Sequence, residues 1–261
     1  MAVTVKTSHE IDLMRQAGRY LAEVHEALRD YVRPGITTKD IDRYGEQLIR
    51  ERGCIPNFLN YEGFPASICV SVNDEVVHGI PTDEHVLREG DIVSLDAGLI
   101  YKGYHSDAAR TWPVGKVSEE AEALMRVTRE SFFVGIAFAK AGHHLHEICR
   151  AIGEYANERG YGVVEDLTGH GIGTSLHEDP MIPNYRQKGR GMLLVPGMTF
   201  AIEPMINVGT KDVYWDDENG WTVYTEDGSL SSHYENTIVI RDGEPEILTL
   251  TSDERNESGR I

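Results

Sequence analysis

Four acidic side chains and one histidine lie in or beside segments whose apolar neighbours predict buried strands: Asp96, Asp107, His170, Glu203 and Glu235. A buried carboxylate without a partner is costly, and four that converge would repel one another unless some were protonated. Two divalent cations would cancel the four negative charges, and carboxylates can bridge two ions about 3.5–4 Å apart. One imidazole among carboxylates favours Mn, Fe, Co or Zn over an all-oxygen Ca or Mg site.

Each of these residues also has a plainer explanation when it is taken alone. An acid at a strand end is usually a cap or a surface ion pair, and a lone histidine usually belongs to the core or a loop. The glycines around His170, in Thr-Gly-His-Gly-Ile-Gly (168–173), let backbone and substrate approach closely. Such a stretch could instead bind phosphate, but it lacks both G-x-G-x-x-G and a Lys-Ser/Thr ending.

Other histidines fall into two groups. His78, in Val-Val-His-Gly-Ile-Pro, and His177 are candidate proton donors or hydrogen-bond donors to a substrate carbonyl. The closely spaced residues His143, His144 and His146 could be mistaken for a metal site, but they lie at the start of a predicted outer helix. We interpret that cluster as solvated surface.

An internal duplication supports the acidic pair Asp96 and Glu203. Three glycines recur 107 positions later, and six identities fall within residues 35–53 alone. Six residues after the last matched glycine stands Asp96 in one copy and Glu203 in the other. The matched pairs are Gly35 with Gly142, Gly53 with Gly160, Gly90 with Gly197, Ile41 with Ile148, Arg43 with Arg150, Glu51 with Glu158, Arg52 with Arg159 and Leu87 with Leu194. The repeat predicts two related halves, each with an acid facing a shared centre.

The elements that must position these residues are two helices followed by strands, an order that occurs twice along the chain. Thr7 and Glu10 form a capping-box pattern at the start of a helix that ends before Pro34-Gly35. Helices are also predicted at 38–52, 118–140 and 145–159. The predicted strands are 67–72, 91–100, 105–112, 198–207, 221–226, 231–240 and 246–250, with a turn at Lys102-Gly103 and a two-residue hairpin at Asp227-Gly228.

This order predicts an α+β fold in which curved antiparallel sheets surround a central cleft and the helices lie outside. We expect one catalytic domain over residues 1–261. Its pseudo-twofold halves span about 8–113 and 114–250, and the polar tail 251–261 is expected to be frayed.

Composition limits the partners and the compartment. The net charge of −18 argues against nucleic acid and anionic membranes as partners. Three cysteines without a metal spacing favour a reducing compartment, and no signal peptide is recognised, so we expect a cytoplasmic protein. Nothing in the sequence demands more than a monomer.

From about residue 8 to 250 the chain resembles the type I methionine aminopeptidases of the pita-bread metallopeptidase family. The resemblance rests on Asn-Tyr-Glu-Gly-Phe-Pro-Ala-Ser-Ile-Cys (60–69), Val-Asn-Asp-Glu-Val-Val-His-Gly-Ile-Pro (72–81), Asp-Ala-Gly (96–98), Ser-Asp (106–107), Gly-His-Gly-Ile-Gly (169–173), Leu-His-Glu-Asp-Pro (176–180), Phe-Ala-Ile-Glu-Pro (200–204) and Tyr-Glu-Asn-Thr-Ile (234–238).

The resemblance implies a role for each site residue. Asp96 would chelate one divalent metal, Asp107 and Glu235 would bridge two, and His170 and Glu203 would complete the other. His78, His177 and Glu203 would be catalytic, with Glu203 also a proton shuttle. The substrate pocket would be formed by Tyr61, Phe64, Cys69, His78, His177 and Trp221. A monovalent cation would bind near Asn73 and Ser231.

The implied activity is hydrolysis of the initiator methionine from nascent polypeptides with small second residues, by a water that two metals activate. The ribosome is a further candidate partner, although no docking motif is visible. Phe58 and Leu176 stand where some relatives carry cysteine and phenylalanine, so the shape of the pocket is left open. An X-Pro aminopeptidase or dipeptidase and a catalytically inactive binding module are the competing interpretations.

Overall fold

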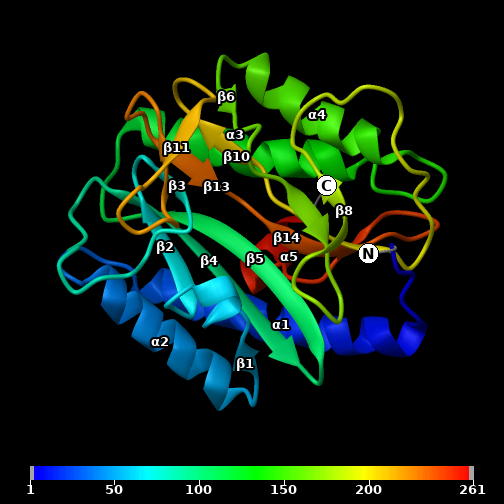
Figure 1. Cartoon of the computed structure of the whole chain (residues 1–261), viewed down its shortest axis with the longest axis horizontal. Helices are drawn as coiled ribbons and strands as arrows, with labels where there is room; N and C mark the ends of the chain where they lie inside the picture. Colours follow the sequence, from blue (N-terminus) through cyan, green and yellow to red (C-terminus); the bar gives the residue numbers. More distant parts are fainter. Residues whose placement is uncertain (1–2, 259–261) are drawn as a thin grey trace.

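The structure is a computed structural model that describes residues 3–258. Its strands lie between two pairs of helices (Figure 1). The first pair is α1 (Ser8–Tyr31) and α2 (Thr38–Glu51), and the second is α3 (Glu119–Ile136) and α4 (Leu145–Asn157). The predicted α+β class is therefore confirmed.

The duplication is visible in the backbone. The six matched glycines all have positive φ, between 69° and 98°. The amide of Gly35 donates to the carbonyl of Leu87 at 2.8 Å, and the equivalent amide of Gly142 donates to Leu194 at 3.1 Å. In each half a two-residue strand pairs with residues that follow the candidate acid, Asp96 or Glu203. The paired residues occupy equivalent positions in the repeat. These pairs are β1 (Ile55–Pro56) with β4 (Ile92–Tyr101) and β6 (Gly162–Val163) with β10 (Met205–Asn207).

The four long helices agree with the sequence except at their C-terminal ends. Thr7 and Glu10 form the predicted capping box of α1. Helix α3 ends at Ile136, earlier than the predicted residue 140, because Lys140 pairs with Arg241 in an isolated bridge and the amide of Ala141 donates to the Arg241 carbonyl. Tertiary pairing thus ends this helix before its helical sequence pattern does.

Four antiparallel sheets place the candidate site. In the first half, β1, β2 (Ile68–Val72) and β5 (Tyr104–Pro113) all pair with β4, and Lys102-Gly103 turns between β4 and β5 as predicted. The second half has the order β15-β14-β9-β7-β8. These strands are β15 (Glu246–Ile247), β14 (Asn236–Val239), β9 (Thr199–Ile202), β7 (Gly169–Gly171) and β8 (Glu178–Ile182).

Two smaller sheets complete the strands, and they correct one prediction. One has the order β13-β10-β6 and the other β11-β12-β3, with β3 (Glu75–Val77), β11 (Val213–Trp215), β12 (Val223–Thr225) and β13 (Ser231–His233). Asp227-Gly228 does turn the chain, since the Gly228 amide donates to the Thr225 carbonyl. The predicted two-residue hairpin is nevertheless wrong, because β12 pairs with β11 and β3 whereas β13 pairs with β10.

Two predicted strands are interrupted, each at a candidate site residue. Residues 198–207 divide into β9 and β10 at Glu203-Pro204, where proline has no amide to donate. Residues 231–240 divide into β13 and β14 at Tyr234-Glu235. The interruptions free these two acids from regular strand geometry.

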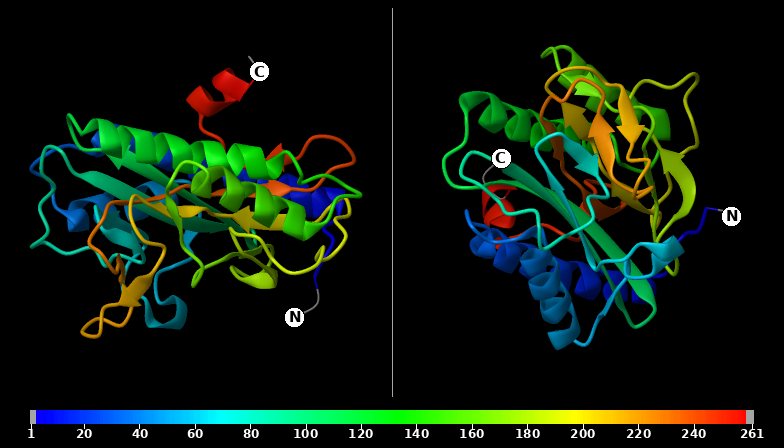
Figure 2. Two further views of the ribbon diagram at one scale, coloured as in Figure 1. Left: turned by 90° about the horizontal axis from the view of Figure 1, so that it is seen from above. Right: turned by 60° about the vertical axis from the view of Figure 1, so that its left-hand side comes forward.

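The prediction of a frayed tail is wrong for the residues that the structure describes, and 259–261 lie outside them. Residues Ser252–Ser258 form helix α5, which stands at the edge of the molecule in the left-hand view of Figure 2. The Thr251 amide donates to Glu254 Oε2 and the Glu254 amide donates to Thr251 Oγ1. This is the capping-box pattern that located α1, and it was overlooked in a polar segment.

Three apolar clusters carry the fold. Leu21, Ile41 and Leu95 are among those that bury α1 and α2 against the first sheet, and Phe132 and Ile152 among those that bury α3 and α4 against the second. A third cluster spans both halves beneath the candidate site and consists of Ile11, Met14, Phe58, Phe64, Ala66, Cys69, Ile172, Leu176, Ala201, Val239 and Leu248. In residues 3–258 no helix has the length and apolar character needed to cross a bilayer.

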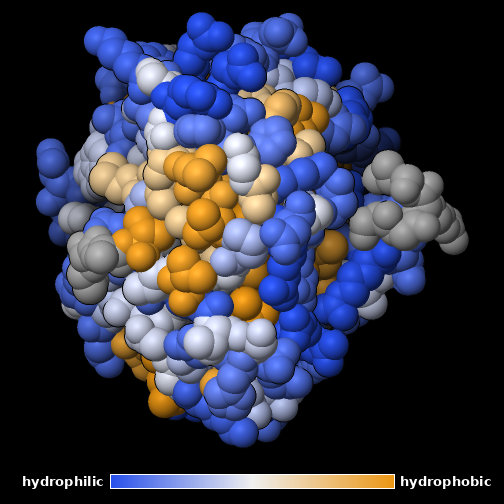
Figure 3. Space-filling view, turned by 90° about the vertical axis from the view of Figure 1, so that its right-hand side faces the viewer, coloured by the Kyte–Doolittle hydropathy of each residue, from blue (hydrophilic) through white to orange (hydrophobic). Residues whose placement is uncertain are grey.

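The face shown in Figure 3 is largely hydrophilic around its edges, and apolar side chains gather near its centre. Val5, Met181 and Leu193 are exposed large apolar side chains, with exposed fractions of 54%, 69% and 50%.

Candidate metal centre

The five side chains singled out from the sequence come together in one cavity of about 170 Å³. Asp96 lies in β4, Asp107 in β5 and His170 in β7, while Glu203 follows β9 and Glu235 precedes β14. The Nε2 atom of His170 lies 3.6 Å from Glu203 Oε1 and 3.9 Å from Asp107 Oδ2. Potential ligand atoms of Asp107, His170 and Glu235 all lie within 4.8 Å of one another.

The long β4–β5 hairpin brings Asp96 and Asp107 to the same place. Asp96 pairs with Ala109, and Asp107 pairs with Gly98, so the two acids are diagonal neighbours on one face of the sheet. The Asp107 amide donates to Thr237 Oγ1, which in turn donates to the Asp107 carbonyl. The register of the hairpin therefore fixes both carboxylates from the first half.

Burial and mutual repulsion disfavour the charged forms of the four acids in this cavity. Burial raises the pKa of Asp96 to about 7. Burial, followed by the neighbouring carboxylates, raises the pKa values of Asp107, Glu203 and Glu235 well above their ordinary range. Asp96 Oδ1, Asp107 Oδ1 and Glu235 Oε1 are buried without a hydrogen-bond partner among the described residues. Such orphaned oxygens fit metal cations, which would supply both the missing partners and the missing charge.

His170 is oriented as a metal ligand would be. Its Nδ1 donates to the carbonyl of Gly171 at 2.9 Å, which leaves the Nε2 lone pair toward the carboxylates. Burial, and then His177, lowers the pKa of His170 to about 3. The ring is thus neutral, the form of imidazole that binds metals.

The aromatic and apolar residues that the resemblance assigned to substrate line the same cavity. Its walls include Phe58, Tyr61, Glu62, Phe64, Cys69, His78, Leu176, His177 and Trp221. The rings of Phe64 and Trp221 meet edge to face with centroids 5.3 Å apart, and the Tyr61 hydroxyl lies 2.8 Å from His177 Nδ1. The cavity therefore has a polar floor, formed by the four acids and His170, and a wall in which aromatic and apolar side chains predominate.

His78 adopts an unusual backbone conformation at this wall. Its φ is +58°, in the left-handed region that non-glycine residues rarely occupy. Burial, and then His177, lowers the pKa of His78 to about 4, so its ring is neutral. A strained backbone at a cavity commonly marks a side chain held in place for function.

Two residues at the site were not singled out from the sequence, one in the cavity wall and one that contacts Glu203 from outside the cavity lining. Glu62 is exposed at the cavity wall. His233 is buried, and its Nε2 lies 3.7 Å from Glu203 Oε2. Its position two residues before Glu235 was an available signal.

The remaining candidates lie outside this cavity. Asn73 and Ser231 do meet, since the Ser231 amide donates to the Asn73 carbonyl at 2.8 Å. His143 and His144 lie at the start of α4, where both contact Glu147. His146 is partly exposed beside them.

Gly171→Ala is expected to disturb the site through the backbone. A methyl group there would lie 2.2 Å from the carbonyl oxygen of Asp179, so β7 or β8 must shift. We expect a loss of stability of about 1–3 kcal/mol, typical of overpacking, together with weaker metal binding because His170 is the preceding residue. Thermal unfolding and metal titration measure both effects. Gly243→Ala is the matched control because its methyl group would meet no atom within 4 Å, and an equal response in both variants would contradict the argument.

Comparison with known proteins places this cavity in a family. Residues 12–242 match the model of Metallopeptidase family M24. The methionine aminopeptidase of Clostridium acetobutylicum is 53% identical over 95% of this chain and 99% of its own length. The crystal structure of methionine aminopeptidase from Rickettsia prowazekii superimposes with a TM-score of 0.93 at 40% identity, covering 95% of this chain and all of that one.

A more distant likeness bears on the competing interpretation. The Xaa-Pro dipeptidase of Bacillus anthracis matches 94% of this chain at 26% identity and a TM-score of 0.75, but this chain covers only 61% of that protein. This chain therefore spans the whole of the Rickettsia prowazekii methionine aminopeptidase but little more than half of the dipeptidase. The family match and the identities show that the chain belongs to metallopeptidase family M24 and has the pita-bread fold of its methionine aminopeptidases.

Proposed function

We propose that this chain is a metal-dependent aminopeptidase that removes the N-terminal methionine from polypeptides, preferring small second residues. The observation that carries the proposal is a single cavity in which four acids, two of them buried, and a neutral histidine adjoin an aromatic pocket. The similarity to methionine aminopeptidases over nearly the whole chain supports the same activity.

Two divalent cations would occupy the polar floor. Asp96 would hold one, Asp107 and Glu235 would lie between the two, and His170 and Glu203 would hold the other. Bound there, the cations would lower the pKa of a shared water and supply a nucleophile at neutral pH. The mixture of oxygen and nitrogen donors favours Mn, Fe, Co or Zn.

The aromatic wall would hold the methionine side chain. Tyr61, Phe64, Cys69 and Trp221 provide an apolar surface of limited volume beside the acids. A flexible thioether chain packs well against aromatic rings, with the sulfur about 5 Å from a ring. Leu176 and Phe58 border the same space, so they contribute to the choice of the first residue.

Neutral histidines and a carboxyl group would handle the protons. A Tyr61 hydroxyl that donates to His177 Nδ1 would leave the His177 proton on Nε2, where it would stabilise a developing oxyanion. His78 would hydrogen-bond the scissile amide or the next residue. The raised pKa of Glu203, caused by burial and then by Asp96, suits a group that accepts and returns a proton.

The finer assignments also belong to this proposal. The substrates would be nascent polypeptides in the cytoplasm, the enzyme would act as a monomeric single domain with two duplicated halves, and a monovalent cation would bind near Asn73 and Ser231. Contact with the ribosome remains a candidate without a docking segment assigned.

A peptide panel with defined metals tests the activity. Met-Ala-Ser should be cleaved at least about 100-fold faster than Leu-Ala-Ser or Ala-Pro-Ser, because about 3 kcal/mol separates a well-filled pocket from a poorly filled one. Rates are measured by release of the free amino acid. Comparable rates for the X-Pro peptide would favour the competing aminopeptidase or dipeptidase.

A further inference from the structure

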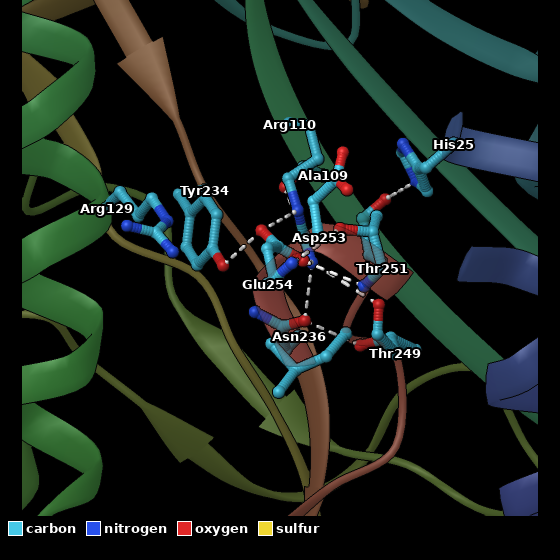
Figure 4. A network of polar contacts seen from close by, with 12 residues as sticks. His25, Ala109, Arg110, Arg129, Tyr234, Asn236, Thr249, Thr251, Asp253 and Glu254 are labelled. Carbon is cyan, nitrogen blue, oxygen red and sulfur yellow. Dashed lines mark hydrogen bonds and ion pairs between the residues drawn. The ribbon is translucent and has the colours of Figure 1, made fainter. Parts of the chain in front are cut away.

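A buried arginine, Arg110, holds the backbone of Glu235. Figure 4 shows its side chain among Tyr234, Asn236 and Glu254. Arg110, in β5, is 2% exposed. Its Nη1 donates to the carbonyls of Ala109 and Glu235, and its Nη2 donates to Asn236 Oδ1 at 2.7 Å and to the Thr249 carbonyl at 3.3 Å. One guanidinium therefore binds the peptide groups on both sides of the junction between the two sheets.

That junction is also where the two halves exchange main-chain hydrogen bonds. The Glu235 amide donates to the Ala109 carbonyl at 2.9 Å, and the Ala109 amide donates to the Glu235 carbonyl at 3.4 Å. Asp107 lies two residues from Ala109, so the same contact joins the segments that carry two of the candidate ligands. A shift of either strand here would change the separation of their carboxylates.

Helix α5 supplies the charge that keeps Arg110 in place. Glu254 Oε1 lies 2.9 Å from Arg110 Nε, and Glu254 Oε2 lies 2.9 Å from Nη2, a bidentate pair. The Tyr234 hydroxyl donates to Glu254 Oε1 at 2.7 Å. Although burial alone would raise it, Arg110 lowers the pKa of Glu254 to about 2, so the pair is ionised at neutral pH.

The other acids of α5 make ion pairs of a different kind. Asp253 pairs with Arg29 of α1 at 2.7 Å, and Glu257 pairs with Arg129 of α3 at 2.6 Å. Their side chains are 66% and 63% exposed, and exposed pairs contribute little to stability. Both attach the helix without bonding to the strands of the site, so they are matched controls for Glu254.

We infer that Glu254, acting through Arg110, is a positioning residue that fixes the separation of the Asp107 and Glu235 carboxylates in the metal centre. The inference rests on the metal centre proposed above. Without Glu254, Arg110 would be a buried charge lacking its partner, and its side chain would move toward water. The Glu235 carbonyl would then lose its Arg110 donor and keep only the Ala109 amide at 3.4 Å, so the two strands would be held together less firmly.

Cobalt titration of the metal-free full-length protein, followed by visible absorption, tests the inference without any measurement of turnover. Glu254→Gln should weaken cobalt binding by about 10- to 100-fold, the range seen when a group that orients metal ligands is removed. Asp253→Asn and Glu257→Gln should change it by less than about twofold. With cobalt in excess, Glu254→Gln should lower kcat on Met-Ala-Ser more than it changes KM.

A double variant separates positioning from stability. Arg110→Met combined with Glu254→Met leaves no unpaired charge, so it should unfold at a temperature near that of wild type. Its cobalt affinity should still be weakened, because the Glu235 carbonyl keeps only the long hydrogen bond from the Ala109 amide. Wild-type affinity in the double variant, or in Glu254→Gln, would overturn the inference. Failure of the wild type to bind cobalt would instead refute the proposed metal centre.

Discussion

Glu235→Ala is expected to abolish metal-dependent hydrolysis while leaving the fold largely intact. Glu235 is 2% exposed, and one of its oxygens has no hydrogen-bond partner among the described residues. Burial, and then Asp107, Glu203 and Asp96, raises its pKa, so the metal-free protein gains nothing from its charge. Replacing Glu235 should reduce the repulsion between the carboxyl groups in the metal-free protein. In the metal-bound protein it should remove one metal ligand.

The expected loss is at least about 1,000-fold in kcat/KM, equivalent to about 4 kcal/mol of transition-state stabilisation. Activity on Met-Ala-Ser with defined manganese or cobalt measures it, and circular dichroism checks the fold. Glu244→Ala is the control, since that side chain is 80% exposed and forms a surface ion pair with Lys140. Normal activity in Glu235→Ala would remove this residue from the site.

The sequence located the site because local rules and the duplication agreed there. A capping box, glycines with positive φ and a ten-residue hairpin strand are short-range features, and each predicted an element that the structure contains. The register of the repeat then placed Asp96 and Glu203 at equivalent points of two halves. Because those halves share a core, the two acids had to converge, and no long-range information beyond the repeat was needed.

What the sequence did not predict depends on contacts between distant segments. The pairing of Ser231 with Asn73, and of β13 with β10, decides that Asp227-Gly228 turns without forming a hairpin. Helix α5 is ordered by ion pairs with α1, β5 and α3, although its own residues are polar. The burial of Arg110 and His233 likewise has no local signature. Such features follow from the assembled fold.

Removing the divalent metals is expected to inactivate the enzyme reversibly. The cavity then keeps four acids with raised pKa values and three neutral histidines, which can accept a proton from water but cannot lower the pKa of that water. Activity should fall by at least about 1,000-fold after chelation and return with added Mn or Co. Full activity after exhaustive metal removal would contradict the metal mechanism.

The pH dependence of cobalt binding to the metal-free protein provides a second measurement, because the direction of the change can be predicted. Protons and metal ions compete for the same oxygens, so binding releases protons and weakens as the carboxyl groups become protonated. Because burial raises the pKa of Asp96 to about 7, cobalt affinity should fall steadily as the pH drops below about 7. An isolated carboxylate with an ordinary pKa near 4 would bind equally well from pH 8 to pH 6. A flat affinity over that range would therefore show that the acids do not share one buried site, even if chelation still inactivated the enzyme.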